Sequence, residues 1–552
     1  MIPMHAPIMA LAASALLPIT ATAQTIETTH GAVAGTTTGT VSAFRGIPYA
    51  QAPIGPMRWT PPVPAVAWKG VRDASKSGPA CIQPKYPATS LYRDDPPTMS
   101  EDCLSLNVWA PVKSSIGARK APVMVWIHGG SLAVGFNGSP IYDGAKIAAR
   151  GVVVVSINYR LGIFGYLAHP ALSQESPHHA SGNYGLLDQI EALKWVRANA
   201  AAFGGDPDNI TIFGESAGAL SVMGLMTSPL SRGLFHKAIA ESGYMISLPE
   251  LTKASHGLPS GEQVGTFVGA ALKAPTIAAL RAIDAQTLST AAAAGGFLPL
   301  PTVDGWALTR QLVDSFDKGE QARVPVIAGF NAGELRTLRG LVPPIPTDAA
   351  IYEKEIRARY GDLAEQFLKL YPSSQIEESM LETLRDGIYG WTSDRLARSQ
   401  AAIGQAGYLY YFDHSYPAAD ALKLPAFHAA EVPYVFGLLA EANALPNWPK
   451  IPLNPDETGL SEAMIGYWTS FARTGKPSAA GAPTWPGIAD KGGYLRFAAR
   501  PEALSGLFTD RFALQEEVVA RRRRDGTQSW IQNLGIVAPP LPARTADAAR
   551  PN

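Results

Sequence analysis

One serine stands in a sequence setting that favours nucleophilic chemistry. Residues 214–218 read Gly-Glu-Ser-Ala-Gly, so Ser216 has a glycine two positions away on each side. An apolar run at 210–213 precedes this motif and a helical pattern at 220–226 follows it. A serine on a sharp strand-to-helix turn exposes its hydroxyl at the sheet edge, and the glycines let the turn pass close to its neighbours. Because a serine hydroxyl is a weak nucleophile at neutral pH, the motif also requires a general base and a group that orients it.

A second motif supplies backbone donors for a negatively charged intermediate. An apolar run at 123–127 leads into a His-Gly-Gly-Ser-Leu sequence that begins at His128. We expect the amides of Gly130 and Ser131, with the amide of Ala217 directly after the nucleophile, to form an oxyanion hole. The alternative is a Gly-rich turn that only ends a strand. His128 is expected to shape the loop, without a part in proton transfer.

The elements that must position these residues alternate between strands and helices. Continuous apolar runs predict buried strands at 123–127, 152–157, 210–213, 324–329 and 408–412. Apolar residues at helical spacing predict a helix over 186–202. This alternation indicates an α/β fold with a mostly parallel sheet covered by helices on both faces. Segments 247–300 and 352–388 are expected to be helical insertions over the active site.

The composition is that of a globular enzyme without an electrostatic preference for polyanions. Of the 552 residues 46% are apolar, and 46 Lys and Arg balance 46 Asp and Glu, so no net field attracts nucleic acid or an anionic membrane. The basic run at 521–524 is expected to be a solvated helix face. We expect one large domain over 25–537 and, because 538–552 are rich in Pro and Ala, a disordered tail after it.

The N-terminus predicts export, and export in turn predicts a disulfide. The apolar stretch 8–17, followed by Ala-Thr-Ala at 21–23, predicts a signal peptide over 1–24, although no Lys or Arg precedes the stretch. A poorly ordered N-terminal tail is the alternative, and the stretch is too short to span a membrane. In a secreted or periplasmic protein the two cysteines, Cys81 and Cys103, are expected to form a disulfide.

Six motifs separated along the chain carry a resemblance to a known family. They are Phe-Arg-Gly-Ile-Pro-Tyr-Ala from Phe44, Glu-Asp-Cys-Leu-Ser-Leu-Asn-Val from Glu101, Gly-Gly from Gly129, Asn-Tyr-Gly-Leu-Leu-Asp-Gln from Asn183, Gly-Glu-Ser-Ala-Gly from Gly214 and Phe-His from Phe427. In this order they resemble the type-B carboxylesterases, the family that includes the cholinesterases, from about Thr25 to Phe508. The resemblance implies a single α/β-hydrolase domain that cleaves small-molecule carboxylic esters through an acyl-enzyme. It implies no metal and no organic cofactor, while the balanced charge and the short apolar stretch predict no nucleic acid partner and no stable membrane insertion.

The resemblance also implies the two missing members of the site. The family's acid lies in a Gly-x-Asn-x-x-Glu setting, which is matched here by the residues up to Glu334. The family's histidine begins a His-x-x-Glu-x-x-Tyr-Val-Phe pattern, which is matched from His428 onward. Ser216, Glu334 and His428 also follow one another in the chain order expected of this fold. His414 is not chosen, because it follows a predicted strand in a stretch that resembles a structural part of the family.

Further residues receive supporting roles by resemblance. Glu215 lies beside the nucleophile, Ser242 matches a buried serine near the triad, and Glu431 is expected to brace the histidine loop. For each of these residues a satisfied buried hydrogen bond is the alternative. Cys81 and Cys103 match the family's N-terminal disulfide.

Departures from the family pattern bear on the substrate. Ser131 stands where many relatives have glycine or alanine, and its β-carbon would narrow the acyl side of the oxyanion hole. The loop between the cysteines contains Tyr86 and Tyr92 but no tryptophan, whereas cholinesterases hold the choline cation on a tryptophan ring there. Choline esters are therefore not expected. Arg336 could favour an acidic acyl group or face solvent, and we favour solvent.

Two alternatives stand beside a general ester hydrolase. The first is an esterase dedicated to one unusual ester, such as a toxin, a drug or a polyester fragment. The second is a non-catalytic adhesion or binding homologue, which gives no physical reason for three separated residues of the right types to occupy the right motifs.

Overall fold

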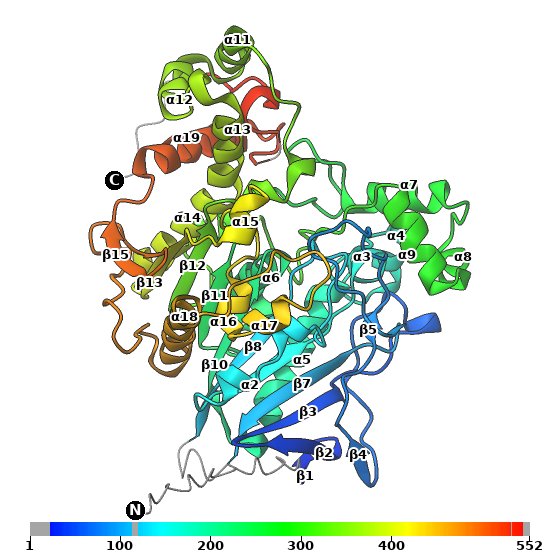
Figure 1. Ribbon diagram of the computed structural model, residues 1–552. Coiled ribbons are helices and arrows are strands. Elements are labelled where there is room, and N and C mark those ends of the chain that lie inside the picture. The colour runs from blue at the N-terminus through cyan, green and yellow to red at the C-terminus, as the bar shows by residue number, and fades with distance from the viewer. Residues whose placement is uncertain (1–21, 113–119, 532, 545–552) are drawn as a thin grey trace, which may run out of the picture.

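The computed structural model describes residues 22–112, 120–531 and 533–544, and a large mixed sheet runs through it (Figure 1). Neighbouring strands in the centre of this sheet are all parallel to one another. In spatial order they are β9 (Val153–Ile157), β8 (Ala121–Ile127), β10 (Gly205–Glu215), β11 (Lys237–Glu241), β12 (Val326–Asn331), β13 (Gly407–Phe412) and β14 (Gly493–Phe497). Every residue of β8, β9, β12 and β13 is buried, as a parallel sheet covered on both faces requires.

Antiparallel strands extend the sheet on both sides. β15 (Pro501–Ser505) pairs with β14. The strands beyond β9 are, in order, β7 (Ser105–Pro111), β3 (Val41–Pro48), β2 (Gly31–Thr38) and β1 (Thr22–Thr28). A short strand, β4 (Val71–Asp73), lies parallel to β2, so that the sheet has 13 strands within the described residues.

The five strands predicted from apolar runs are all present, and the helix predicted at 186–202 is α5 (Tyr184–Asn199). The sequence did not predict β11 or the antiparallel edges. β11 reads Lys-Ala-Ile-Ala-Glu, and its charged ends conceal a strand in which every residue is buried. The outer strands are rich in Thr and Gly and lack the continuous apolar runs of the centre.

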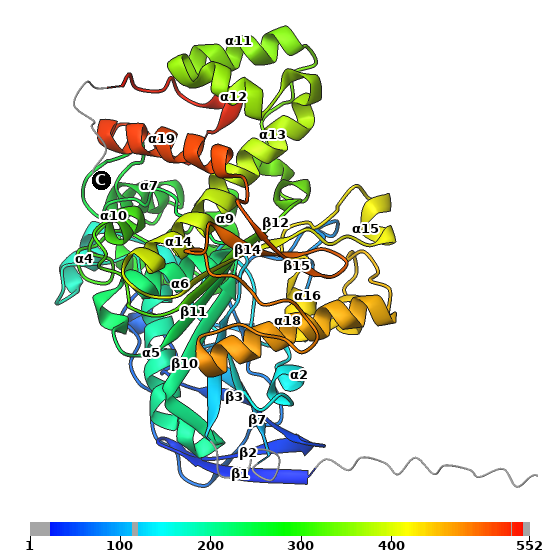
Figure 2. The same cartoon turned by 90° about the vertical axis from the view of Figure 1, so that its left-hand side faces the viewer.

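Helices cover both faces of the sheet. Figure 2 shows α5 and α6 (Ala217–Thr227) on one side of the strands and α2 (Ala145–Ala148) and α18 (Pro455–Thr474) on the other. Successive side chains of β8 alternate between the two faces: Val125 packs in the cluster under α6, and Trp126 packs in the cluster under α18. The sheet is therefore the middle layer of three.

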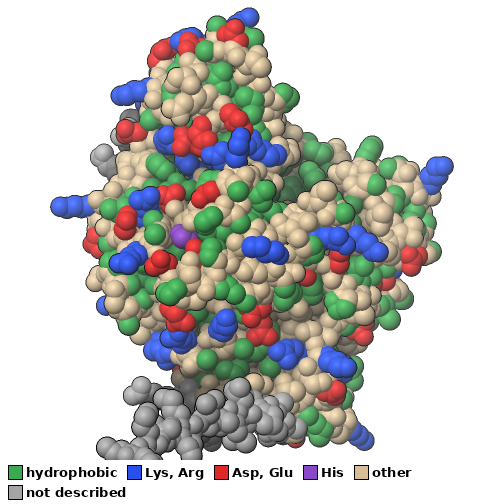
Figure 3. Space-filling model, viewed as in Figure 1, with side chains coloured by type: hydrophobic (Ala, Val, Ile, Leu, Met, Phe, Trp, Pro, Cys, Tyr) green, Lys and Arg blue, Asp and Glu red, His purple; other side chains and the backbone are tan. Residues whose placement is uncertain are grey.

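Two groups of helices stand at one end of the sheet, and all of them except α19 come from the segments where insertions were predicted or begin just before them (Figure 1). One group comprises α7 (Gly261–Ala271), α8 (Ile277–Ala282) and α9 (Ala285–Ala294). The other comprises α11 (Ala349–Tyr360), α12 (Ala364–Leu370), α13 (Ile376–Arg385) and α19 (Thr509–Asp525). Each group has an apolar cluster of its own. In Figure 3 the surface is hollowed between them, and hydrophobic side chains lie in the hollow.

The basic run on α19 is a solvated face only in part, which corrects the sequence prediction. Arg521 is 2% exposed and Arg522 is fully buried, whereas Arg524 is exposed. Arg521 pairs with Asp362 at 2.6 Å, and Arg522 donates a hydrogen bond to the carbonyl of Trp530. The sequence pattern could not show the burial of Arg521, because its partner Asp362 lies 159 residues away in the chain.

The ends of the domain differ in part from the prediction. Strand β1 begins at Thr22, while residues 1–21 of the predicted signal peptide lie outside the described residues. Past the predicted start of the tail, Ala538 is fully buried and the N–H of Leu541 donates to the carbonyl of Arg359 at 2.7 Å, so this part of the chain still packs on α11. Residues 545–552 lie outside the described residues.

The predicted disulfide joins Cys81 to Cys103, with the two Cα atoms 5.0 Å apart. It closes the loop that carries Tyr86 and Tyr92, so the position of this loop is fixed at both ends. Among the helices of the described ranges, none combines the length and the apolar composition that a bilayer crossing needs.

Candidate active site

Ser216 lies on the sharp turn between β10 and α6. Its backbone has φ 56° and ψ −118°, a strained conformation for a residue with a side chain, and its N–H donates to the carbonyl of Glu241 at 2.8 Å. The flanking glycines are sterically required: a Cβ on Gly218 would lie 2.0 Å from the carbonyl oxygen of Ile127, and one on Gly214 would lie 2.6 Å from it. The motif therefore forces the serine to the carboxyl end of the strand.

The predicted oxyanion loop lies against this turn. A Cβ on Gly129 would come within 3.2 Å of the Ser216 Cβ, so the loop and the serine border the same space. Gly130 has φ 101° and Ser131 has φ 55°, which bends the loop away directly after the strand. Ala217 is the first residue of α6, and its N–H therefore has no acceptor within the helix.

Glu334 and His428 are brought together by two loops at the ends of β12 and β13. Glu334 begins a short helical turn, η5 (Glu334–Arg336), and one of its carboxylate oxygens is hydrogen-bonded to Nδ1 of His428. Its other oxygen accepts bonds from the Ser242 hydroxyl at 2.7 Å and from the Asn331 N–H at 2.8 Å. Glu334 is fully buried, and these donors fix the orientation of its carboxylate.

The other ring nitrogen of His428 faces Glu215, the residue directly before the serine. Nε2 of His428 lies 3.1 Å from Oε1 of Glu215. Within the described residues, no hydrogen bond joins the hydroxyl of Ser216 to the imidazole of His428. The predicted line of hydroxyl, imidazole and carboxylate is thus closed at its acid end and open at its serine end.

A cavity of about 750 Å³ opens over these residues and includes Ser216, Glu215 and His428 in its wall. Most of its wall is aromatic or aliphatic. These lining side chains include Tyr86, Tyr92, Tyr142, Tyr244, Tyr389, Trp448, Ile246, Leu298, Leu338, Leu341, Leu384 and Ile388. Asp94 adds a carboxylate, and within the described ranges no Lys or Arg lines the cavity. Such a wall suits an uncharged, largely apolar ligand.

The model of the carboxylesterase family matches residues 22–515, which is most of the chain. This chain belongs to the carboxylesterase family. It is therefore a carboxylic-ester hydrolase with the α/β-hydrolase fold, as its sequence motifs predict. The family match spans the central sheet and every residue predicted for the site.

Curated relatives of this carboxylesterase have different named substrates. A fumonisin B1 esterase of Sphingopyxis macrogoltabida is 36% identical over 87% of this chain and 87% of its own length. A para-nitrobenzyl esterase of Bacillus subtilis (strain 168) is also 36% identical, over 84% of this chain and 92% of its own length. A solved structure of a PNB esterase matches with a TM-score of 0.77 at 32% identity, over 89% of this chain and 99% of that one.

Buried carboxylates surround the histidine of this carboxylesterase. Burial alone would lower the pKa of His428, but the charges of Glu215 and Glu334 outweigh it and raise this pKa to about 9. Burial raises the pKa of Glu215, and it raises the pKa of Glu431 well above its usual range. One oxygen of Glu431 accepts a hydrogen bond from the Asn331 side chain. The imidazole is therefore held toward its protonated form.

Sequence reasoning gave no role beside His428 to Tyr92 or Tyr389, and it did not find the buried carboxyl group of Glu241. The Tyr92 hydroxyl donates to the carbonyl of His428 at 2.8 Å, and the ring of Tyr389 lies 5.2 Å from the imidazole, centroid to centroid. Glu241, whose pKa burial raises to about 8, accepts a hydrogen bond from the Trp468 indole at 2.8 Å. Nothing in the spacing of these residues gives a signal, because their contacts are all long-range.

Three residues that the sequence placed outside catalysis lie in other environments. His128 is buried, stacks on Tyr159, and has its pKa lowered by burial to about 4, which suits a neutral structural ring. His414 pairs with Glu457 at 2.8 Å. Arg336 neither lines the cavity nor faces solvent freely, because it is paired with Glu378. No group of three or more His, Cys, Asp or Glu in the described ranges is arranged to hold a metal ion.

Proposed function

We propose that this carboxylesterase uses Ser216 as nucleophile, His428 as general base and acid, and Glu334 as the group that orients His428. One observation carries the proposal: the hydrogen bond between Glu334 and Nδ1 of His428 lies beside the strained turn of Ser216, in the wall of one apolar cavity. This arrangement has the parts that acyl transfer by a serine requires.

In the proposed reaction Nε2 of His428 takes the Ser216 proton as Oγ attacks the ester carbonyl carbon. The carbonyl oxygen becomes an oxyanion that accepts hydrogen bonds from the amides of Gly130, Ser131 and Ala217. The imidazolium then gives its proton to the leaving alcohol, and an acyl-serine remains. A water molecule, deprotonated by the same imidazole, attacks the acyl carbon and releases the acid and the free serine.

These steps require Nε2 of His428 to leave Glu215 and to approach the hydroxyl of Ser216. Nε2 of His428 lies 3.1 Å from Glu215, so the ring must lose its proton and turn toward the serine before attack. Catalytic hydrogen bonds often tighten only when substrate is bound, and the open serine end is compatible with the proposal. Glu215 then acts as a competing partner for the resting ring. Ser242 and Glu431 act on the triad through Glu334 and Asn331.

Labelling by a fluorophosphonate tests the nucleophile. The wild-type enzyme should label with one equivalent, and Ser216→Ala should not label at all. Ser221→Ala is the matched control, because Ser221 is a buried serine of the same helix whose hydroxyl bonds inside the fold. Labelling that persists in Ser216→Ala, with native circular dichroism, would overturn the assignment.

We propose that the substrate is an uncharged ester with apolar groups on either side of the carbonyl. An esterase dedicated to one unusual ester remains the second candidate, because one relative is named for fumonisin B1 and another, equally identical, for a para-nitrobenzyl ester. A panel of esters that varies acyl length and charge separates the two candidates. A general esterase should vary smoothly in kcat/KM over the panel, whereas a dedicated one should show a single outlier.

We also propose that the enzyme is exported to the periplasm or beyond. The disulfide between Cys81 and Cys103 supports this proposal, since such bonds persist in oxidising compartments. N-terminal sequencing of the mature protein tests it. A start between residues 21 and 25 is expected, and a mature protein that keeps Met1 would contradict it.

A further inference from the structure

The helix that forms one wall of the cavity is interrupted where it meets the active site. Between α13 and α14 (Trp391–Ala402) the chain makes a π-helical turn, η9 (Asp386–Gly390). Such turns are rare and are frequently found at functional sites. Leu384 and Ile388 line the cavity here, and the Tyr389 ring lies 5.2 Å from that of His428. The π turn therefore positions side chains that border the imidazole.

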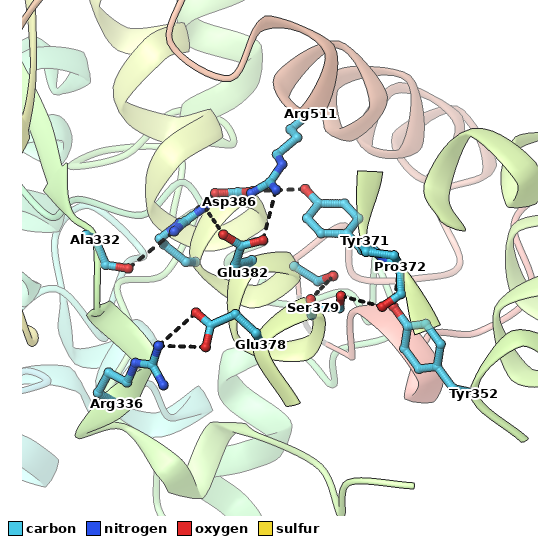
Figure 4. Close-up of polar contacts among 12 residues, drawn as sticks. Ala332, Arg336, Tyr352, Tyr371, Pro372, Glu378, Ser379, Glu382, Asp386 and Arg511 are labelled. Atoms are coloured by element: carbon cyan, nitrogen blue, oxygen red, sulfur yellow. Dashed lines mark hydrogen bonds and ion pairs between the residues drawn. The ribbon is translucent and has the colours of Figure 1, made fainter. Parts of the chain in front are cut away.

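A network of four charged groups holds this turn (Figure 4), with Arg385 and Asp386 buried and Glu382 and Arg511 partly exposed. Asp386 is fully buried and accepts hydrogen bonds from Arg385 at 2.8 Å, from the Tyr371 hydroxyl at 3.0 Å and from Arg511 of α19 at 3.2 Å. Arg511 also pairs with Glu382 at 2.9 Å. Two guanidinium groups and two carboxylates balance one another, which a buried set of charges requires.

One member of this network also reaches the loop of the catalytic acid. Nη1 of Arg385 donates to the carbonyl of Ala332 at 3.3 Å, two residues before Glu334. On the other side of Glu334, Arg336 forms a forked pair with Glu378 of α13, at 2.6 and 2.8 Å. The Arg336 pair is partly exposed and contributes little in free energy, whereas the Arg385 side chain is 5% exposed.

Arg511 belongs to the same network but has no contact with the acid loop. Its partners are Glu382, Asp386 and the rings of Tyr371 and Phe508. Arg385 and Arg511 are thus two guanidinium groups that neutralise the same carboxylate, and only Arg385 extends to Ala332. This difference allows a matched comparison.

We propose that Arg385 is a positioning residue, which fixes the loop of Glu334 to the π turn that carries Tyr389. The positions of Glu334, His428 and the cavity wall at Tyr389 are then fixed relative to one another. The inference rests on the proposed function, because it takes Glu334 as the catalytic acid. It extends that function to a residue that the site motifs do not include.

The test compares Arg385→Met with Arg511→Met in the full-length enzyme. Both variants remove one guanidinium that pairs with the buried carboxylate of Asp386, and both should lose thermal stability. Per active site counted with fluorophosphonate, Arg385→Met should lower kcat about tenfold, because a loosened acid misplaces the base. Arg511→Met should keep kcat within about twofold, since it leaves the contact with Ala332 in place.

The pH profile of kcat/KM supplies a readout that lost stability alone would not move. His428 is faced by the carboxylates of Glu215, Glu334 and Glu431 and by the rings of Tyr92 and Tyr389. A loosened Glu334 stabilises the imidazolium less, so the acidic limb should move to lower pH in Arg385→Met. Loss of a nearby cation alone would move it to higher pH, which is the shift expected of Arg511→Met.

Arg385→Lys covers the case in which the methionine variant does not fold. Lysine keeps a charge for Asp386 but cannot fork to Ala332 as well, so the same loss of kcat is expected. Equal effects of the Arg385 and Arg511 variants, or a folded Arg385 variant with wild-type kcat and pH limb, would overturn the proposal. Failure of the proposed function is a different result: the wild-type enzyme itself would then lack labelling that depends on Ser216.

Discussion

At the scale of single residues, the site is dominated by negative charge around one imidazole. Glu334 binds one ring nitrogen of His428, and Glu215 faces the other. Both carboxylates favour the protonated ring, and a protonated ring cannot take the proton of Ser216. The charges that hold the proposed base in place should therefore also set the pH at which it can accept a proton.

The pH dependence follows from the direction of this shift. Because the pKa of His428 is raised to about 9, the neutral imidazole becomes the main form only above that pH, and kcat/KM should still be rising on the alkaline side of neutrality. Glu215→Gln removes one carboxylate, lowers the pKa of His428 and should move the acidic limb to lower pH. Glu262→Gln, at a partly exposed glutamate of α7, is the control. An acidic limb that stays in place or moves upward in Glu215→Gln would contradict this account.

At the scale of elements, the turn between β10 and α6 depends on glycine where two backbones meet. A Cβ on Gly218 would lie 2.0 Å from the carbonyl of Ile127, which belongs to the neighbouring strand β8. Farther along the same helix, a Cβ on Gly224 would find its nearest neighbour, a Leu186 methyl, at 3.5 Å. The two glycines of α6 are therefore under different constraints.

Alanine at these two positions should have opposite effects. Gly218→Ala forces β8 and α6 apart, and we expect a loss of about 1–3 kcal/mol in the free energy of unfolding together with most of the esterase activity. Gly224→Ala adds a methyl group at ordinary van der Waals distance from Leu186 and should stabilise by about 0.5–1 kcal/mol with activity retained. Urea denaturation and hydrolysis of a short ester measure both. Equal tolerance at the two sites would contradict the close approach at Gly218.

The same scale shows how far the sequence could predict the fold and the site. Continuous apolar runs predicted five of the seven central strands, because a parallel strand buried on both faces has no polar side, and they missed β11 and β14. A local strand-turn-helix motif led to Ser216, and the resemblance to the carboxylesterases led to Glu334 and His428 as the other members of the proposed site. Arg385 and the buried Arg521 gave no such signal, since Ala332 and Asp362, which they contact, lie far away in sequence and only the folded chain brings them close.

At the scale of the whole molecule, selectivity is expected from a cavity that lies between the central sheet and the two groups of helices. Asp94 comes from the disulfide-closed loop, and Leu298 and Leu341 come from segments beside the two helical groups. Among the described residues no cation lines this space, although both signs of charge are mixed on the surface in Figure 3. The cavity should therefore disfavour substrates that carry an extra negative charge.

The preference for an uncharged acyl group over a negatively charged one can be measured with two esters of similar size. The p-nitrophenyl monoester of succinate should have a kcat/KM about tenfold lower than p-nitrophenyl pentanoate, which corresponds to about 1.4 kcal/mol of repulsion at an intermediate dielectric. Asp94→Asn should narrow this ratio, because it removes a carboxylate from the wall and leaves the shape. A ratio near one in the wild-type enzyme, or an unchanged ratio in the variant, would contradict the charge argument.

Single-turnover acylation, followed by peptide mapping, tests the central claim most directly. With a slowly hydrolysed ester, the wild-type enzyme should carry one acyl group on Ser216. His428→Ala should acquire it about a thousandfold more slowly, since the serine then lacks its base. An acyl group on any other residue, or wild-type acylation in His428→Ala, would contradict the account.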